Sequence, residues 1–257
     1  MATTIVLTNQ KGGVGKTTTT ASLVAGMMKK KYKVLSIDLD PQGNLGFSLG
    51  LNIEEGYSIY EVLTGEIGIK EAIRSTEDYG DIVTSNILLS NADVKFQSNE
   101  RERLLKNALE EVAFEYDYIL IDTPPALNIL TINGYVAADY LIIPMAGEIL
   151  SLVGISQIKD TIDSIKKSFN PNLKVLGIAL IRFNERTNLA KEVEEMANAV
   201  AEQIGTKLFK TKVRLSVMVA ECPAHGMSIL DYAPRCNPAL DYKRLVDEVI
   251  YRIEKAS

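Results

Sequence analysis

Short apolar runs alternate with longer amphipathic stretches along almost the whole chain. The apolar runs predict buried strands at Ile5–Leu7, Val34–Ile37, Ile82–Val83, Tyr118–Ile121, Tyr140–Ile143 and Val175–Ile181. Apolar residues at helical spacing predict helices, with Asn99 and Ser151 as N-caps, at Thr17–Met28, Glu100–Val112, Leu152–Phe169 and Asn188–Ile204. This alternation predicts an α/β fold with a doubly wound, mostly parallel sheet flanked by helices.

A last amphipathic helix is predicted over Pro238–Lys255. One face is apolar, with Leu240, Val246, Val249, Ile250 and Ile253. The opposite face is mixed in sign, with Asp241, Lys243, Asp247, Glu248, Arg252 and Glu254. A helix that lies on a membrane surface is instead rich in lysine and arginine, so this helix is expected to pack onto the sheet.

Length and composition favour one large α/β domain over residues 1–257. The chain enters a strand almost at once, which predicts a cytosolic protein without a leader or a preceding helix-turn-helix module. Two cysteines and one histidine supply no plausible metal set. The net charge of −5 argues against a generally basic nucleic-acid coat but leaves a local basic patch open.

A glycine-rich loop, KGGVGKTTTT, follows the first predicted strand. Gly12, Gly13 and Gly15 let backbone N–H groups fold around a phosphate chain, and the next residues open a helix whose N-terminus favours negative charge. Lys16 is placed to contact the β- and γ-phosphates, and the Thr17 hydroxyl can coordinate Mg²⁺. A plain glycine turn is the alternative, but the order of strand, glycines, lysine and hydroxyl favours nucleotide binding.

The loop departs from the ordinary GxxxxGK[ST] pattern, because Gln10 replaces the first glycine and Lys11 adds a second lysine. In this it resembles the deviant Walker A loop of the ParA/MinD family of ATPases. The resemblance implies that Lys11 reaches across a dimer interface to the partner's nucleotide. It also implies that Val14 and Thr18 belong to the nucleotide-binding loop.

Two acidic motifs follow at predicted strand ends. In DLDPQGN, alternation places Asp38 and Asp40 on the same side of the extended segment, although a strand cap followed by a turn would use the same residues. By resemblance to the family's second motif, Asp40 orients or activates the attacking water and Asp38 supports the metal's water shell. In YILIDTPP, Asp122 ends an apolar strand as in a Walker B motif and would hold Mg²⁺ through water.

The base is predicted to be adenine. Guanine-specific P-loop proteins use an NKxD pattern, whereas here Asn184 is followed by Glu185 and no Asn precedes a Lys anywhere. In relatives the equivalent asparagine and a later proline, here Pro223, contact adenine. Pro223 also fits an ordinary turn.

These motifs together resemble a small ParA/Soj-type partition ATPase that lacks an N-terminal DNA-binding domain. The resemblance implies ATP and Mg²⁺ as cofactors and a cycle in which ATP produces a sandwich homodimer. That dimer would coat nonspecific double-stranded DNA of the nucleoid until a ParB-like centromere-binding partner stimulates hydrolysis. No membrane partner is expected.

A local basic cluster supports the DNA prediction. Within eight residues that include no acid, the chain carries Lys207, Lys210, Lys212 and Arg214. Arg235 and Lys243 follow in a region that the fold could bring near, and Lys166 and Lys167 are weaker additions. Such a run is usually a solvated face, yet phosphate-backbone binding is favoured here.

Three other functions compete. A MinD-like membrane-cycling ATPase would use the same chemistry, but the mixed charge of the last helix speaks against it. A family member that positions a protein cluster or conjugation machinery cannot be separated by sequence. A metabolic P-loop enzyme such as dethiobiotin synthetase has no need of Lys11 in trans or of the DLDPQGN motif.

Overall fold

In the computed structural model, which describes residues 1–96, 99–147, 155–185 and 189–256, a seven-stranded sheet forms the centre of the molecule. Its strands stand in the order β3-β4-β2-β5-β1-β6-β7. Their bounds are β1 Thr3–Leu7, β2 Val34–Asp38, β3 Arg74–Thr76, β4 Gly80–Val83, β5 Tyr118–Asp122, β6 Tyr140–Ala146 and β7 Lys174–Ile181. Among the described strands only the edge strand β3 runs antiparallel, so the predicted mostly parallel sheet is confirmed.

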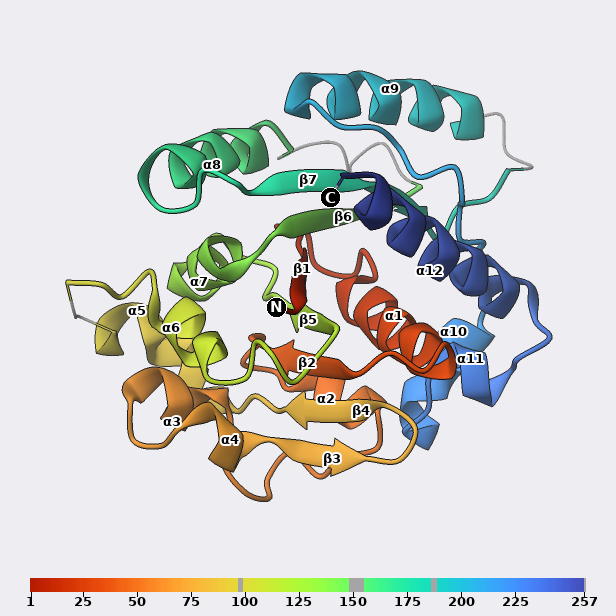
Figure 1. Ribbon diagram of the computed structural model, residues 1–257. Coiled ribbons are helices and arrows are strands. Elements are labelled where there is room, and N and C mark those ends of the chain that lie inside the picture. The colour runs from red at the N-terminus through yellow and green to blue at the C-terminus, as the bar shows by residue number, and fades with distance from the viewer. Residues whose placement is uncertain (97–98, 148–154, 186–188, 257) are drawn as a thin grey trace.

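Helices cover both faces of this sheet (Figure 1). Those packed on one face include α3 Ile59–Thr64, α6 Leu104–Glu110, α7 Ile129–Ala137, α8 Ile155–Ser168 and α9 Leu189–Ile204. Those on the other face include α1 Lys16–Lys29, α11 Ile229–Tyr232 and α12 Asn237–Ala256. Shorter helices are α2 Asn44–Ser48, α4 Ile69–Ala72, α5 Ala92–Lys95 and α10 Met218–Glu221, with 3₁₀ turns at Ile87–Asn91 and Cys222–His225.

The central strands are mostly apolar because both of their sides are covered. In β1, Val6 packs into one core while Ile5 and Leu7 pack into the other. Alternate side chains of a strand point to opposite faces, so a strand buried on both sides appears in sequence as a continuous apolar run. The six predicted strands are therefore confirmed, and the short polar edge strand β3 escaped prediction.

The predicted N-cap at Asn99 is wrong. Helix α6 begins only at Leu104, and its first turn is capped from another helix. The Asn133 side chain of α7 accepts a hydrogen bond from the Leu105 N–H at 3.0 Å and donates to the Arg101 carbonyl at 2.7 Å. A tertiary contact thus fixes the start of this helix. Ser151, Leu152 and Asn188, the other predicted cap and helix starts, lie outside the described residues.

Helix α12 packs on α1 and the sheet as expected. The approach is close at Gly26, where a Cβ atom would lie 2.4 Å from Val246 Cγ2. The buried stripe differs from prediction at its start, because Leu240 is 39 % exposed whereas Asp241 is buried. Within the described ranges, no helix combines the length and apolarity that a membrane crossing requires.

Candidate functional site

The glycine loop lies at the carboxyl end of β1, in the middle of the sheet, and leads directly into α1. Gly13 and Gly15 have φ angles of +74° and +86°, in the left-handed region that favours glycine. At Gly15 a Cβ atom would also lie 3.2 Å from Ile181 Cγ2. The exposed backbone of Gly12 and Gly13 and the N-terminus of α1, which has no side-chain cap, form the geometry that binds phosphate.

Lys16 points into the loop that it follows. Its Nζ donates to the Lys11 carbonyl at 3.3 Å, and the residue is only 6 % exposed. Burial lowers the pKa of Lys16, while the negative charges of Asp122 and Asp40 oppose that shift. The base of the loop is fixed by Asn9, which accepts from the Lys11 N–H and donates to the Pro144 carbonyl of β6.

Asp122, at the end of β5, meets the first turn of α1. Thr17 Oγ1 donates to Asp122 Oδ2 at 2.6 Å, and Thr20 Oγ1 lies 3.4 Å from Oδ1. Burial raises the pKa of Asp122 to about 7, although the Thr17 hydrogen bond and the charge of Lys16 oppose this. The predicted neighbours Thr17 and Asp122 are therefore in direct contact.

Asp38 stands beside Asp122 in the register of the parallel strands β2 and β5. Its Oδ1 accepts from the Asp40 N–H and its Oδ2 from the Leu45 N–H, both at 2.9 Å. Burial, followed by the charge of Asp122, raises the pKa of Asp38 well above its usual range. Asp40 is 8 % exposed and accepts from the Gln42 N–H at 3.0 Å.

Asp38 and Asp122 are buried side by side, and burial raises the pKa of both. A cation bound next to them would stabilise their charged forms. Mg²⁺ prefers oxygen ligands and keeps several waters when it binds protein and phosphate together. The Thr17 hydroxyl and the Asp122 and Asp38 carboxylates supply such oxygens. In the described part of the chain, no group of three His, Cys, Asp or Glu side chains has a metal-binding arrangement.

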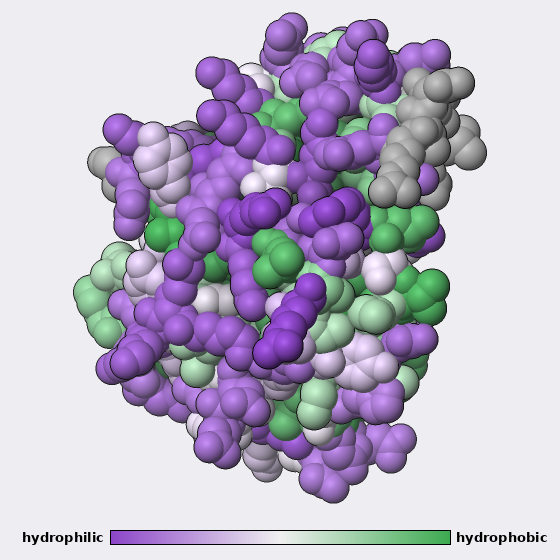
Figure 2. All heavy atoms as spheres, turned by 90° about the vertical axis from the view of Figure 1, so that its right-hand side faces the viewer, coloured by the Kyte–Doolittle hydropathy of each residue, from purple (hydrophilic) through white to green (hydrophobic). Residues whose placement is uncertain are grey.

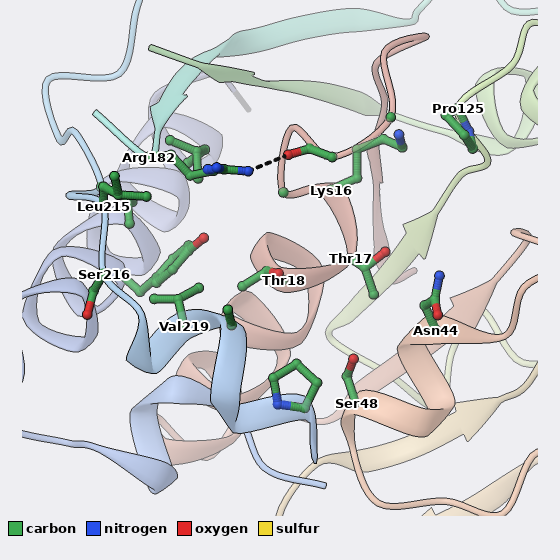
Figure 3. Close-up of a pocket in the computed structure, with 18 of the residues that line it drawn as sticks. Lys16, Thr17, Thr18, Asn44, Ser48, Pro125, Arg182, Leu215, Ser216 and Val219 are labelled. Carbon is green, nitrogen blue, oxygen red and sulfur yellow. Dashed lines mark hydrogen bonds between the residues drawn. The ribbon is translucent and has the colours of Figure 1, made fainter. Parts of the chain in front are cut away.

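A cavity of about 770 Å³ opens beside the loop (Figure 3). Lys16, Thr17 and Thr18 line one side of it, and Asp40, Asn44 and Ser48 another. Much of the apolar lining comes from β7 and the segment before α11, with Ile181, Val213, Leu215, Val217, Val219, Ala220 and Pro223. Predicted residue Pro223 thus lines this cavity, whereas Asn184 lines a neighbouring one of about 790 Å³ that shares Arg214, Leu215 and Ser216.

The two walls of the cavity touch through glycine backbones. Gly50, just after α2, and Gly226, after the Cys222–His225 turn, have φ angles of +81° and +63°. A Cβ atom on Gly226 would lie 2.6 Å from Gly50 Cα. The segment that starts at Asp38 and the segment that carries Pro223 therefore pack without room for a side chain between them.

The predicted DNA-binding residues form two groups in the structure, one exposed and one paired with acidic residues. Lys207, Lys210, Arg235 and Lys243 are exposed. Lys212 instead forms an ion pair with Glu194 at 2.6 Å. Arg214 makes two bonds of 2.7 Å to Asp241, whose side chain is 4 % exposed. The face that carries α10, α11 and the start of α12 is mostly hydrophilic, with scattered apolar patches (Figure 2).

Two basic residues near these sites escaped prediction. Arg182 lines the loop cavity and donates from Nη1 to the Gly13 carbonyl at 3.3 Å. Arg244 is 69 % exposed on α12, 3.8 Å from Asp241. The helical pattern could have indicated Arg244 on the polar face beside Lys243, but no sequence signal marks Arg182.

Comparisons with known proteins show the family of the chain. A family model described as an AAA domain matches residues 2–175. The chain is 37% identical over 254 residues to the chromosome-partitioning ATPase Soj of Treponema pallidum, covering 98% of each chain. It is 39% identical over 252 residues to the chromosome partitioning protein ParA of Myxococcus xanthus, covering 96% of this chain and 88% of that protein.

Among solved structures, cobyrinic acid a,c-diamide synthase from Mycobacterium smegmatis, with bound ADP and magnesium, superposes with a TM-score of 0.87. The two sequences are 30% identical, and the match covers 100% of this chain and 97% of that one. The identity to the partitioning proteins is higher and extends over nearly the full length. The chain belongs to the AAA-domain family of P-loop ATPases and, within it, to the ParA/Soj group with the deviant Walker A loop.

Proposed function

We propose that this protein, as a single ATPase domain, binds ATP with Mg²⁺ and uses hydrolysis to partition DNA, either a plasmid or a chromosome. One observation carries the proposal: the Thr17 hydroxyl meets the buried Asp122 directly below a glycine loop that holds two lysines. This arrangement suits a nucleoside triphosphate, because the loop amides and Lys16 bind its phosphates while the oxygens of Thr17 and Asp122 face the cation. When bound, Mg²⁺ would neutralise charge on the β- and γ-phosphates.

The remaining predicted site residues would have separate roles in hydrolysis and in binding of the base. Asp40 borders the cavity on the side of α2 and would orient the attacking water, while the more deeply buried Asp38 would hold the water shell of the metal. Pro223 would contact the adenine from the apolar wall, and Asn184 would approach it from the adjoining cavity. Val14 is buried, so its role would be carried by its backbone.

The proposal includes a homodimer, which the second lysine of the loop, Lys11, supports. The Gly12 and Gly13 backbone is exposed on the outer side of the loop, so a second copy could approach it there. Lys11 would then reach the phosphates bound by the partner subunit. Such a dimer would double the number of basic residues on one surface, and the number of neutralised phosphates sets nonspecific DNA affinity.

For DNA contact, the exposed residues Lys207, Lys210, Arg235 and Lys243 are better placed than the two that are already paired with acids. Lys212 and Arg214 would bring less net charge, because Glu194 and Asp241 balance them. The cycle would be completed in the cytoplasm, on the nucleoid, by a ParB-like partner that stimulates hydrolysis.

The nucleotide chemistry is tested with three variants. Lys16→Ala should abolish ATP binding or hydrolysis, because the developing phosphoryl charge loses its cation. Lys11→Ala should bind nucleotide but fail to form a tight ATP dimer, whereas Asp40→Ala should accumulate the dimer by blocking water attack. ATPase assays and size exclusion with ATP decide this. Unchanged turnover in Lys16→Ala, or a monomer under all conditions, would contradict the proposal.

The cargo is tested by sedimentation on plain DNA and on liposomes with ATP, ADP or neither. Binding to DNA should require ATP, ignore sequence and fall steeply with salt. Joint charge reversal, Arg235→Glu with Lys243→Glu, should weaken DNA binding while ATP binding persists. The matched control is Lys255→Glu, at the other end of α12, which should retain DNA binding. Sedimentation with liposomes alone would favour the membrane-cycling alternative.

A further inference from the structure

Arg182 has an unusual backbone for its residue type. Its φ is +55°, and in the described part of the chain the only other non-glycine residue with positive φ is Lys31. The left-handed region is costly for residues with a Cβ atom, and such strain persists where surrounding contacts impose it. Each of these two residues therefore needs a physical reason.

Lys31 has a simple reason. It follows the end of α1, and its N–H donates to the Met28 carbonyl at 2.8 Å. A left-handed residue commonly ends a helix in this way, because it allows the last carbonyls to find donors. Lys31 is exposed and lies outside the loop cavity.

Arg182 follows a strand, so a helix end cannot explain it. The chain is held on both sides of it: the Ile181 carbonyl accepts from the Gly147 N–H at 3.1 Å, and the Phe183 N–H donates to the Val213 carbonyl at 2.9 Å. Between these two fixed points the backbone turns at Arg182. Figure 3 shows the side chain extending from this turn across the rim of the cavity, with its hydrogen bond to Gly13 dashed.

The contact joins parts of the chain that are 169 residues apart. The acceptor is the carbonyl of Gly13, in the loop that turns its N–H groups toward phosphate. A guanidinium has several N–H donors in a fixed plane, so one bond to this carbonyl leaves others for an anion in the cavity. The positive charge of Lys16 already interacts with Asp122 and Asp40. These acids therefore weaken its attraction for a phosphate chain.

We propose that Arg182 is a nucleotide-positioning residue that holds the Gly13 carbonyl from the opposite wall and donates its remaining N–H groups to the bound phosphate chain. This inference rests on the proposed nucleotide binding. It adds to that site a cation from the residue that follows β7, outside the loop and the acidic motifs. The strained backbone is the cost of directing the guanidinium at the loop.

The test compares Arg182→Gly with Lys31→Gly, because glycine accepts positive φ at both positions. Isothermal titration with Mg²⁺-ADP and a non-hydrolysable Mg²⁺-ATP analogue measures affinity, and thermal melts of the nucleotide-free proteins measure stability. Neither variant should melt lower than the parent. Arg182→Gly should weaken both nucleotides roughly tenfold, the size of one charge-assisted hydrogen bond, while Lys31→Gly binds as the parent does.

Two further readouts separate positioning from a structural role. Arg182→Lys keeps the charge without the planar fork, so its affinity should lie between those of Arg182→Gly and the parent. In the ATPase assay, Arg182→Gly should raise KM and leave kcat within about twofold, because the contact is equally strong in the ground and transition states.

Equal affinity of Arg182→Gly and the parent would overturn the inference, and so would a lower melting temperature for Arg182→Gly alone. Weaker binding by Lys31→Gly to the same extent would also overturn it. If the unsubstituted protein binds neither nucleotide, the proposed function fails as well. Binding by the parent with no effect of Arg182 leaves the proposed function standing and removes only the inference.

Discussion

Replacing Arg214 should destabilise the protein more than replacing its partner Asp241. Arg214 makes bonds of 2.7 Å from Nε and Nη2 to the Asp241 carboxylate, and its backbone N–H adds a third at 3.2 Å. The side chains differ in burial: Asp241 is 4 % exposed and Arg214 is 39 % exposed. The two halves of the pair therefore lose very different amounts of solvation when left alone.

The magnitudes follow from that difference. Arg214→Ala leaves a buried carboxylate with the 3.2 Å backbone contact and the exposed Arg244 at 3.8 Å, so it should cost roughly 3 kcal/mol. Asp241→Ala leaves a guanidinium that water can reach, so it should cost about 1 kcal/mol. The double variant should cost less than Arg214→Ala alone, because no charge then remains buried and unpaired.

Urea unfolding followed by circular dichroism measures all three variants and the parent at neutral pH, with the slope of the transition as a check on two-state behaviour. In thermal melts of the same proteins, Arg214→Ala should lower the melting temperature by roughly 6 to 12 °C for a chain of this size. The double-mutant cycle should give a coupling energy of about 2 kcal/mol.

Equal losses for the two single variants that add in the double would refute this reasoning, since they would mean that the buried carboxylate does not depend on Arg214. The stability of the Arg214→Ala variant also decides which variants can be used to test DNA binding. If Arg214 holds α12 in place, a loss of DNA affinity in an Arg214 variant reports on folding, whereas Arg235 and Lys243 are exposed and report on contact.

Three further outcomes are expected. Burial raises the pKa of Asp122 to about 7, so the folded nucleotide-free protein holds this proton more tightly than the unfolded chain. The free energy of unfolding should therefore fall as pH rises from about 4 to about 7, and Asp122→Asn should flatten that dependence in urea titrations. Gly226→Ala should cost roughly 2 to 4 kcal/mol, because positive φ and overlap with Gly50 both oppose it, while Gly205→Ala, with φ of +76° and open space, should cost about 1 kcal/mol. Asn133→Ala should cost roughly 2 to 3 kcal/mol in thermal melts, since it leaves the Leu105 N–H without its cap.

Much of the fold and of the nucleotide loop could be predicted because their signals are local. Lys16 and Thr17 are adjacent in sequence, and their places at the start of α1 follow from the glycines before them. A strand covered on both faces is apolar at every position, so β5 and its terminal Asp122 could also be found. Tertiary contacts could not be predicted in this way. The start of α6 depends on Asn133, and the residues near Asn99 give no sign of that contact.

The basic cluster at residues 207–214 also has tertiary partners that the local sequence does not indicate. Residues 207–214 contain no acid, yet in the folded protein Glu194 of α9 and Asp241 of α12 pair with two of its four basic side chains. Glu248, also from α12, accepts hydrogen bonds from the Lys210 and Thr211 N–H groups. Charge that is local in sequence is neutralised by residues that the helices bring back from elsewhere.

The place of β1 in the sheet has a consequence for synthesis of the chain. Its two neighbours are β5 and β6, through pairs such as Thr3 with Tyr118 and Ile5 with Tyr140. At roughly 5–20 residues per second, a ribosome needs on the order of ten seconds after making β1 to complete both neighbours. Until β5 is made, β1 has neither of its partner strands. The nucleotide loop, although among the first segments to leave the ribosome, can take its shape only after β6 has followed it.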